Sequence, residues 1–405
     1  MKEKILPILR FDNFNDYWQK SSLLSQVEVR RGLTYKPNDV RSNGARVLRS
    51  SNIVDDSFVI SDDDVFVSKD VINIPRVSNG DILVTAANGS TKLVGKHAII
   101  KNLPDDEIVV HGGFMLLFKT EQNYFVNAWM SSNEYKRVLQ FVQGGNGAIG
   151  NLSSAILKNM KMSVPSLPEQ SAIGSLFRTL DDLLTSYKDN LANYQSLKAT
   201  MLSKMFPKAG QTVSEIRIDG FEGEWEIKRA DEIFKSVSKK NRASLPVLSA
   251  SQIDGMVLRD EIGIDIKYDE ATLNNYKVVK PGQFVIHLRS FQGGFALSKL
   301  EGITSPAYTI IDFIDKSNNL SDFWNSILTS RDFIKRLETV TYGIRDGKSI
   351  SFKDFSSLKF VFPNYNEQQA IGKYFTNLDN LIISYQEKIS QLETLKKKLL
   401  QDMFI

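Results

Sequence analysis

The feature that most constrains the fold of this chain is a stretch of 38 residues that occurs twice. Residues 169–206 align without a gap with residues 367–404, at a constant offset of 198 residues. Of the 38 aligned pairs, 16 are identical, where chance would give about two. The identical pairs include Glu169/Glu367, Ala172/Ala370, Gly174/Gly372, Tyr187/Tyr385, Lys198/Lys396 and Phe206/Phe404. A repeat of this length indicates an internal duplication.

Each copy predicts one long helix, because its apolar side chains alternate in steps of four and three residues. That spacing is typical of a coiled-coil seam, which is narrower than the apolar stripe of an ordinary core helix. We therefore expect two rods of about 57 Å, from ~1.5 Å rise per residue, that pair with each other as a spacer. The predicted seam residues are Leu180, Leu184, Tyr187, Leu191, Tyr194, Leu378, Ile382, Tyr385, Ile389 and Leu392.

Both predicted helices open with a capping-box pattern, Ser166-x-x-Glu169 and Asn364-x-x-Glu367, in which side chains satisfy backbone donors of the first turn. The first helix is expected to stop at Pro207, which cannot continue it. Lys198 and Lys396 occupy seam positions, where a lysine sets the register or pairs with an acid; the alternative is a lysine that extends its amine to solvent.

The globular blocks before each helix are also related, although more weakly. Trp18 and Trp225 open the two blocks in similar surroundings, and both blocks contain short β-rich runs punctuated by glycine. The expected strands are 80–84, 114–118, 282–286 and 308–311, and helical patterns lie around 127–141 and 321–337. We interpret the fold class as α+β: two tandem mixed α/β domains separated by two long helices that pair as an antiparallel coiled coil with a pseudo-two-fold axis. The predicted divisions are 1–165, 166–206, 207–363 and 364–405.

Composition limits the function classes. The chain has 405 residues, 42% of them hydrophobic, which suits two or three globular units. It has no cysteine, which excludes disulfides and thiolate metal sites and favours an intracellular protein. No signal-peptide pattern and no run of ~20 apolar residues is present. We expect a soluble, cytoplasmic protein.

Basic residues gather in two stretches although the net charge is only +4. Such local clusters favour a phosphate-binding surface, and a solvated charged face is the alternative. The first cluster consists of Arg30, Arg31, Lys36, Arg41, Arg46 and Arg49, and the second of Lys228, Arg229, Lys235, Lys239, Lys240 and Arg242.

Catalytic and metal-binding patterns are absent from the sequence. Residues 145–150 match G-x-G-x-x-G but precede a polar stretch, and we interpret them as a flexible glycine loop. His97, His111 and His287 are scattered without ligand-spaced partners, so we expect structural roles and no metal site. The acidic run 62–64 lacks the spacing of a calcium loop, and we expect a solvated turn.

Diverged globular domains alternating with near-identical long helices resemble the specificity subunits of type I restriction-modification systems, the HsdS family. The resemblance covers essentially the whole chain. It is carried by Pro165-x-x-Pro168-Glu169-Gln170-x-Ala172-Ile173 before the first helix, by Pro363-x-x-x-Glu367-Gln368-x-Ala370-Ile371 before the second, and by the Trp18 and Trp225 openings.

The resemblance implies two target-recognition domains, each reading one half of a bipartite, asymmetric DNA site, with the helices setting the gap. It also implies that two modification subunits, which bind S-adenosylmethionine and methylate adenine at N6, dock on the helices, and that a restriction subunit joins them. None of the 11 prolines follows Asn or Asp, so the Asn-Pro-Pro-Tyr motif of such methyltransferases is missing. We therefore expect a non-catalytic subunit without a cofactor of its own.

Base readout requires polar side chains that reach the groove, and glycine-bearing loops can supply them. An alternative hypothesis is a protein-interaction scaffold that does not bind DNA and is built on the duplicated coiled coil. The candidate base readers are Asn88, Ser90, Thr91 and Lys92 in the first block, and Arg289, Ser290, Gln292, Arg345 and Lys348 in the second.

Overall fold

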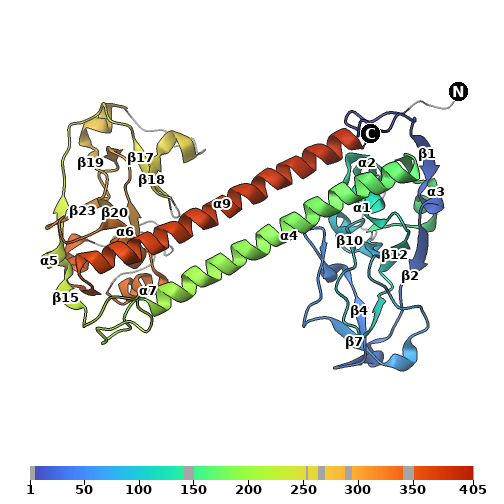
Figure 1. Cartoon of the computed structure of the whole chain (residues 1–405), viewed down its shortest axis with the longest axis horizontal. Helices are drawn as coiled ribbons and strands as arrows, with labels where there is room; N and C mark the ends of the chain where they lie inside the picture. The colour runs from blue at the N-terminus through green and yellow to red at the C-terminus, as the bar shows by residue number, and fades with distance from the viewer. Residues whose placement is uncertain are drawn as a thin grey trace. The chain divides into compact units, whose positions relative to one another are not determined.

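The computed structural model describes residues 5–140, 150–251, 254–262, 270–287, 294–340 and 351–404 (Figure 1). Its contacts divide the chain into two compact units. Unit 1 contains Met1–Lys188 and Glu387–Ile405, and unit 2 contains Asp189–Gln386. Each unit therefore holds one globular block and half of each long helix. No helix in the described ranges is long and apolar enough to cross a membrane.

The two predicted long helices are confirmed. Helix α4 runs from Leu167 to Lys204 and helix α9 from Tyr365 to Met403 (Figure 1). Along the seam, every predicted position is buried or half-buried while most intervening positions are exposed, as a 3.5-residue repeat requires. Leu180, Leu184 and Leu378 are buried.

Contacts inside each unit show that the helices pair antiparallel. In unit 1 the Lys396 amine lies 2.6 Å from a carboxylate oxygen of Asp181. In unit 2 the equivalent residues, Lys198 and Asp379, form an ion pair. Residue numbers rise along α4 as they fall along α9, which defines the antiparallel direction. Both seam lysines thus pair with an acid of the opposite helix.

The α4 and α9 starts differ from the predicted capping boxes. The Glu367 backbone N–H does donate to the Asn364 side chain, at 3.1 Å. The carboxylates of Glu169 and Glu367, however, are fully buried and bind Arg10 and Arg217, each through two hydrogen bonds of 2.6–2.7 Å. Burying a carboxylate without a charged partner costs more free energy than leaving the helix cap without its second hydrogen bond. Each glutamate side chain therefore binds an arginine and does not complete the capping box. Each glutamate therefore fixes the segment that precedes its globular block.

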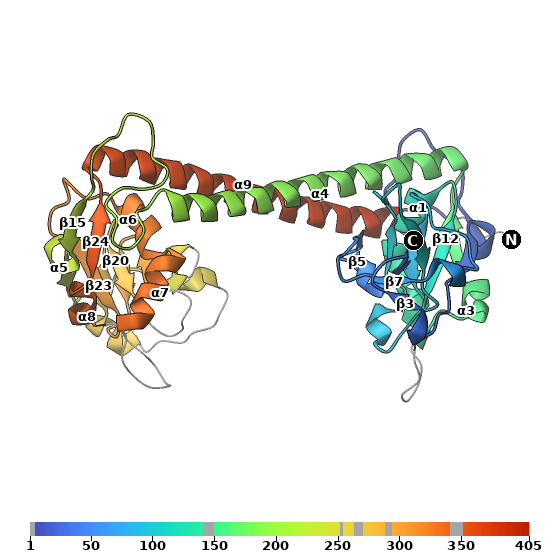
Figure 2. The ribbon, with the colours of Figure 1, turned by 90° about the horizontal axis from the view of Figure 1, so that it is seen from below.

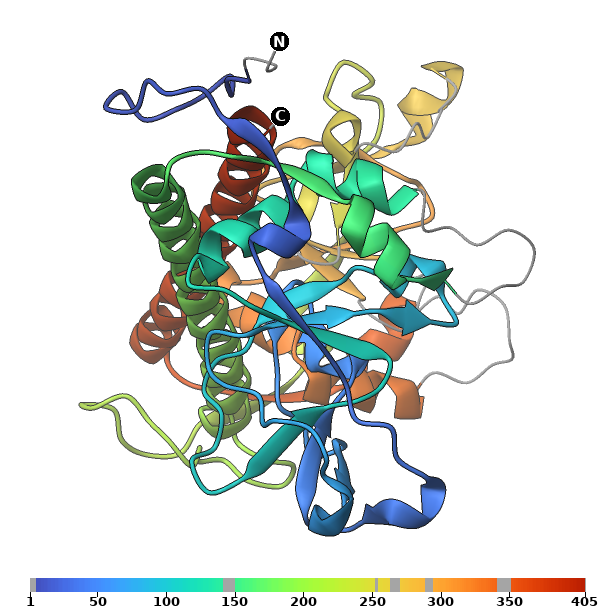
Figure 3. The ribbon, with the colours of Figure 1, turned by 90° about the vertical axis from the view of Figure 1, so that its right-hand side faces the viewer.

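Unit 1 is built on two four-stranded sheets. Its strands are the blue and cyan arrows in Figure 3. The first has the order β10 (His97–Ile99), β8 (Ile82–Thr85), β12 (Met115–Lys119), β2 (Glu28–Arg31), and the second the order β11 (Ile108–His111), β4 (Ala45–Leu48), β7 (Val65–Val67), β3 (Val40–Arg41). Shorter pairs are β1 (Gln19–Ser22) with β14 (Lys161–Val164), β9 (Ala87–Asn88) with β13 (Gly150–Asn151), and β5 (Ile53–Val54) with β6 (Ser57–Phe58). The helices are α1 (Asn123–Ser131), α2 (Asn133–Leu139) and α3 (Ser154–Asn159).

Unit 2 has one four-stranded sheet with helices α6 and α7 beside it (Figure 2). Its order is β16 (Phe234–Val237), β23 (Thr309–Phe313), β20 (Phe284–Ile286), β21 (Phe295–Leu297). The pairs are β15 (Glu226–Arg229) with β24 (Lys359–Phe362), β17 (Leu248–Ser251) with β18 (Gly255–Leu258), and β19 (Lys277–Val279) with β22 (Gly302–Thr304). The helices are α5 (Ala230–Ile233), α6 (Ser321–Leu328), α7 (Arg331–Val340) and α8 (Phe352–Ser356).

The four strands expected from the sequence correspond to β8, β12, β20 and β23. The helical pattern around 127–141 is divided into α1 and α2, because Ser132 leaves the helical conformation and its side chain accepts a hydrogen bond from the Tyr135 N–H. A serine in that position caps the second helix instead of continuing the first.

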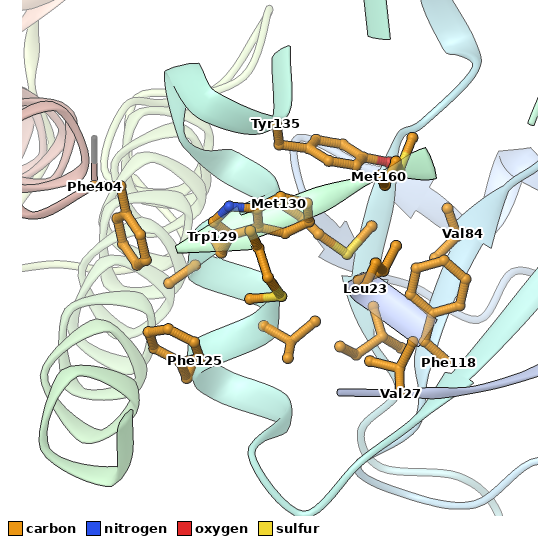
Figure 4. Packing of buried hydrophobic residues seen from close by; sticks show 14 of the residues in the cluster. Leu23, Val27, Val84, Phe118, Phe125, Trp129, Met130, Tyr135, Met160 and Phe404 are labelled. Carbon is orange, nitrogen blue, oxygen red and sulfur yellow. The ribbon is translucent and has the colours of Figure 1, made fainter. Parts of the chain in front are cut away.

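A duplicated phenylalanine closes the core of each unit. Phe404, which follows α9, packs its ring 5.8 Å from that of Phe125 in unit 1 (Figure 4). Its ring also lies 6.3 Å from that of Trp18. Phe206, which follows α4, lies 6.1 Å from Trp225 in unit 2. The end of each helix therefore packs into one globular core, which ties the rod to the domain that it carries.

Candidate nucleic-acid interface

Three residues of the first basic cluster are exposed without an acidic partner among the described residues. Arg31, on β2, donates to the Ser154 hydroxyl at 2.7 Å, and Arg41, on β3, donates to two backbone carbonyls. Lys36 is exposed at the start of the turn that leads to β3. Arg30 is engaged instead with Glu28 at 2.6 Å, which raises the pKa of Arg30. The cations free to meet phosphate are therefore Arg31, Lys36 and Arg41.

Arg46 does not lie on the surface, in contrast to its expected role as a phosphate contact. It is 7% exposed, and its guanidinium binds Asp64 and Glu107, each at 2.7 Å. The hydrogen bond with Glu107 is the largest cause that raises the pKa of Arg46, and Arg46 lowers the pKa of Glu107. Arg46 also lies over the Phe66 ring, 4.6 Å from its centroid. Arg46 links β4 to the segments that carry Asp64 and Glu107. It is therefore not a DNA contact.

The acidic run 62–64 is not entirely a solvated turn, in contrast to the prediction, because Asp64 is buried. Its side chain is buried and accepts hydrogen bonds from Arg46 and from the Asn52 amide at 2.7 Å. A buried carboxylate with charged and neutral donors is a structural element of the core. The run is thus partly internal.

The predicted loop readers of unit 1 gather around strand β9. The Asn88 amide donates to the Ser50 hydroxyl at 3.3 Å, and its oxygen accepts from the Ser90 N–H at 2.9 Å. Ser90, Thr91 and Lys92 are exposed on the following turn. Strand β13 pairs with β9 and brings Asn151 opposite Ala87.

Further contacts join other residues to this region. The N–H groups of Ala86 and Ala87 both donate to the carbonyl of Phe114, at 2.9 and 3.1 Å. Arg49 precedes Ser50, and its Nε is buried without a hydrogen-bond partner among the described residues. We call the connected set the β9 patch: Arg31, Arg49, Ser50, Asn88, Phe114, Asn151 and Ser154.

Sequence reasoning found Arg31, Arg49 and Asn88 of the β9 patch but missed the other members. Phe114 begins an apolar run that predicts a buried strand, so its exposure has no local signal. Ser50, Asn151 and Ser154 are ordinary polar residues whose proximity depends on strand pairing. Only the three-dimensional contacts bring them together.

In unit 2 the second cluster is divided. Lys239, Lys240 and Arg242 are exposed on the segment after β16, and the Val278 N–H donates to the Lys239 carbonyl at 2.7 Å. Lys235 is exposed on β16. Lys228 and Arg229 pair instead with Glu226 and Asp231, both at 2.9 Å. The remaining candidates, Arg289, Ser290, Gln292, Arg345 and Lys348, lie outside the described residues.

Lys277 is a cation that sequence reasoning missed. It lies on β19, and its amine donates to the Tyr308 carbonyl at 2.6 Å. Burial, and to a smaller degree the nearby charge of Lys240, lowers the pKa of Lys277. A phosphate group near the two lysines would relieve this repulsion. The pair is therefore an anion-binding candidate.

The histidines are structural, and no group of His, Asp or Glu within the described ranges could hold a metal ion. His97 is buried between the Gly95 carbonyl at 3.1 Å and the Ser131 hydroxyl at 3.2 Å. Burial lowers the pKa of His97, of His111 and of His287. Burial therefore favours the neutral form of each ring.

Comparison with known proteins assigns the two units to one family. The model of the type I restriction modification DNA specificity domain matches residues 15–193 and 222–394. A protein named as the specificity subunit of the type I restriction enzyme MjaX from Methanocaldococcus jannaschii is 24% identical over 95% of this chain and 92% of its own length. The specificity subunit of EcoKI from Escherichia coli is 25% identical over 44% of this chain and 39% of its own length.

A solved structure has the same fold. The crystal structure of the type I restriction-modification system S subunit from M. genitalium matches with a TM-score of 0.63 and 14% identity, and the match covers 99% of both chains. The two matched domains together span most of the sequence. The chain therefore belongs to the family of type I restriction-modification specificity subunits, and it carries two DNA specificity domains in tandem.

Proposed function

We propose that this chain supplies the DNA sequence specificity of a type I restriction-modification complex, and that each unit reads one half of a bipartite, asymmetric site. The observation that carries the proposal is the tandem pair of specificity domains, on which different polar and basic surfaces are built. Unit 1 carries the β9 patch. Unit 2 carries a lysine cluster, which consists of Lys239, Lys240 and Lys277. Two different surfaces favour two different half-sites. We assign half-site recognition to residues 1–165 and 207–363, and spacing to 166–206 and 364–405.

Cationic and polar side chains have separate roles in this proposal. Contacts to phosphate fix position, whereas hydrogen bonds to base edges discriminate between sequences. In unit 1, Arg31, Lys36 and Arg41 are the positioning candidates. Asn88 is a base-reading candidate, because an amide can pair with both exposed edge groups of adenine.

Unit 2 offers cations for positioning in the described segments, and its base-reading candidates come from the sequence alone. The positioning residues are Lys239, Lys240, Arg242 and Lys277. The base-reading candidates stay Arg289, Ser290, Gln292, Arg345 and Lys348. Their counterparts in unit 1, besides Asn88, are Ser90, Thr91 and Lys92.

The long helices also offer a docking surface for two modification subunits. Leu197 and Leu395 are equivalent residues of the duplicated stretch, and they are 38% and 46% exposed. The same apolar side chain is thus available on each helix for a partner helix. Methyl transfer from S-adenosylmethionine to adenine N6 belongs to those partners, and a restriction subunit joins through the complex. We place the complex in the cytoplasm, where its DNA lies.

Reconstitution tests the proposal. The chain is purified with its modification subunits, genomic DNA is methylated with S-adenosylmethionine, and the modified adenines are mapped by sequencing. We expect an interrupted, asymmetric motif that requires this chain. Methylation with the same motif in the absence of the chain would contradict the proposal and favour an interaction scaffold.

A length change in the helices tests spacing separately from recognition. Inserting seven residues at opposed positions of α4 and α9 preserves the 3.5-residue seam and adds about 10.5 Å to each helix. At ~3.4 Å per base pair, the gap between the half-sites should widen by about three base pairs. Altered half-site bases at an unchanged gap would refute the spacer role.

A further inference from the structure

Phe114 is a large apolar side chain that the fold leaves in solvent. It is 71% exposed and immediately precedes β12. Among the exposed large apolar side chains of the described residues it is the only phenylalanine. Because phenylalanine stabilises a fold by being buried, a ring in this position contributes little to the stability of unit 1. A role in binding is the alternative use of such a side chain.

The backbone of Phe114 is held firmly although its ring is not covered. Its carbonyl accepts hydrogen bonds from the N–H groups of Ala86 and Ala87. The preceding turn is fixed as well, because the Gly112 N–H donates to the Leu48 carbonyl at 2.8 Å and the Met115 N–H donates to the Gly112 carbonyl at 2.8 Å. An anchored backbone presents the ring with little conformational entropy to lose on binding.

The two residues before Phe114 are glycines. At position 113 the neighbouring atoms leave little room for a side chain. A Cβ on Gly113 would lie 3.3 Å from the Leu33 carbonyl and from the Thr34 hydroxyl. A side chain at position 113 would therefore press against the segment of Leu33 and Thr34. The sequence thus keeps the neighbouring positions small while placing a large ring at the end of the turn.

The strand that hydrogen-bonds to the Phe114 backbone carries polar side chains. Asn88 lies on β9, whose first residue bonds the Phe114 backbone, and the Asn88 amide contacts Ser50. Arg49, next to Ser50, buries its Nε and donates to the Asp63 carbonyl at 3.4 Å through a terminal guanidinium nitrogen. A protein partner of Phe114 would require a larger apolar surface, whereas a nucleic-acid base offers both hydrogen-bonding groups and an apolar edge.

We propose that Phe114 is a specificity-determining residue that packs against the C5 methyl group of a thymine in the major groove of the half-site read by unit 1. Apolar side chains recognise that methyl group, which distinguishes thymine from cytosine. Asn88 donates the second N–H of its amide to a neighbouring base edge. The inference rests on the proposed function, since it names one contact of the same DNA surface.

The test combines protein variants with a DNA substitution in the reconstituted methyltransferase. The wild-type motif is mapped first, and each thymine of the half-site that unit 1 reads is then replaced by deoxyuridine, which lacks the methyl group. With the wild-type chain, one replacement should slow methylation about 4-fold, the effect of one buried methyl group. With Phe114→Ala, methylation should be slower by at least about 4-fold, and the same replacement should have no further effect. Ile8→Ala, another exposed apolar residue of unit 1, is the matched control and should behave as wild type.

Three results would overturn the inference: a wild-type methylation rate with Phe114→Ala, an equal effect of deoxyuridine on both chains, or a half-site without thymine. Phe114→Leu keeps an apolar side chain and should retain part of the deoxyuridine effect. The proposed function fails differently, because a wild-type complex would then methylate no bipartite motif at all.

Discussion

Replacing Arg10 by alanine should destabilise unit 1 strongly, because it leaves the buried Glu169 carboxylate without its charged partner. The Glu169 side chain is 0% exposed and accepts two hydrogen bonds from Arg10, at 2.6 and 2.7 Å, and one from the Trp18 indole at 3.2 Å. After the substitution only the neutral indole donor remains. Stranding one member of a buried ion pair costs about 3–5 kcal/mol.

The duplicated partner pair in unit 2 provides an internal comparison. Glu367 binds Arg217 in the same bidentate manner, but the indole N–H of Trp225 has no hydrogen-bond partner in the described part of the chain. Arg217→Ala therefore removes more of the support of its carboxylate than Arg10→Ala does. We expect the larger loss of stability for Arg217→Ala, at the upper end of about 3–5 kcal/mol.

Hydrogen exchange followed by mass spectrometry in increasing urea separates the two units. Arg10→Ala should lower protection in residues 5–140 and leave residues 294–340 protected, and Arg217→Ala should do the opposite. Arg30→Ala is the control, because its partner Glu28 is exposed, and it should leave the urea midpoint unchanged. A stability loss below ~1 kcal/mol for Arg10→Ala would refute the reasoning.

Three further predictions concern the helices, the histidines and the lysine cluster. Asp379→Lys places two cations at the seam, and adding Lys198→Asp should restore stability; the pair is partly exposed, so urea unfolding should show a coupling of about 0.2–1 kcal/mol. Burial lowers the pKa of His97 and His111 below 6.5, so the unfolded chain binds protons at a higher pH than the folded chain does. The free energy of unfolding should therefore fall as the pH drops below 6.5. His97→Gln should flatten this pH dependence, measured as the urea midpoint. Lys277→Ala should reduce the slope of log affinity against log salt by about 0.9 in anisotropy titrations of the complex with duplex DNA, and Lys277→Arg should not.

The helical part of the fold could be predicted because its signal is local and repeated. A 3.5-residue apolar period over 38 residues leaves few alternatives to paired long helices, and the structure confirms them. The β-rich runs gave the central strands for the same reason. Strand order could not be predicted, since β2 pairs with β12 across more than 80 residues of chain.

The errors concern partners that are distant in sequence. Arg46 belongs to a basic stretch, but its carboxylates come from Asp64 and Glu107, 18 and 61 residues away. Glu169 fits a capping box locally, yet Arg10 reaches it across 159 residues. Phe114 is the converse case: its apolar run predicts burial, and the anchored turn before it leaves the ring exposed. Local sequence patterns predict the secondary-structure elements. The ion-pair partners of buried charged residues depend on the tertiary fold and cannot be read from those patterns.

An exchange of one globular domain would test the central claim most directly. Residues 1–165 are replaced by the corresponding domain of another family member, the complex is reconstituted with the same modification subunits, and the methylated adenines are mapped. The account predicts a new sequence in one half of the motif, with the other half and the gap unchanged. A motif that is unaltered, or altered in both halves, would contradict recognition of one half-site by each unit.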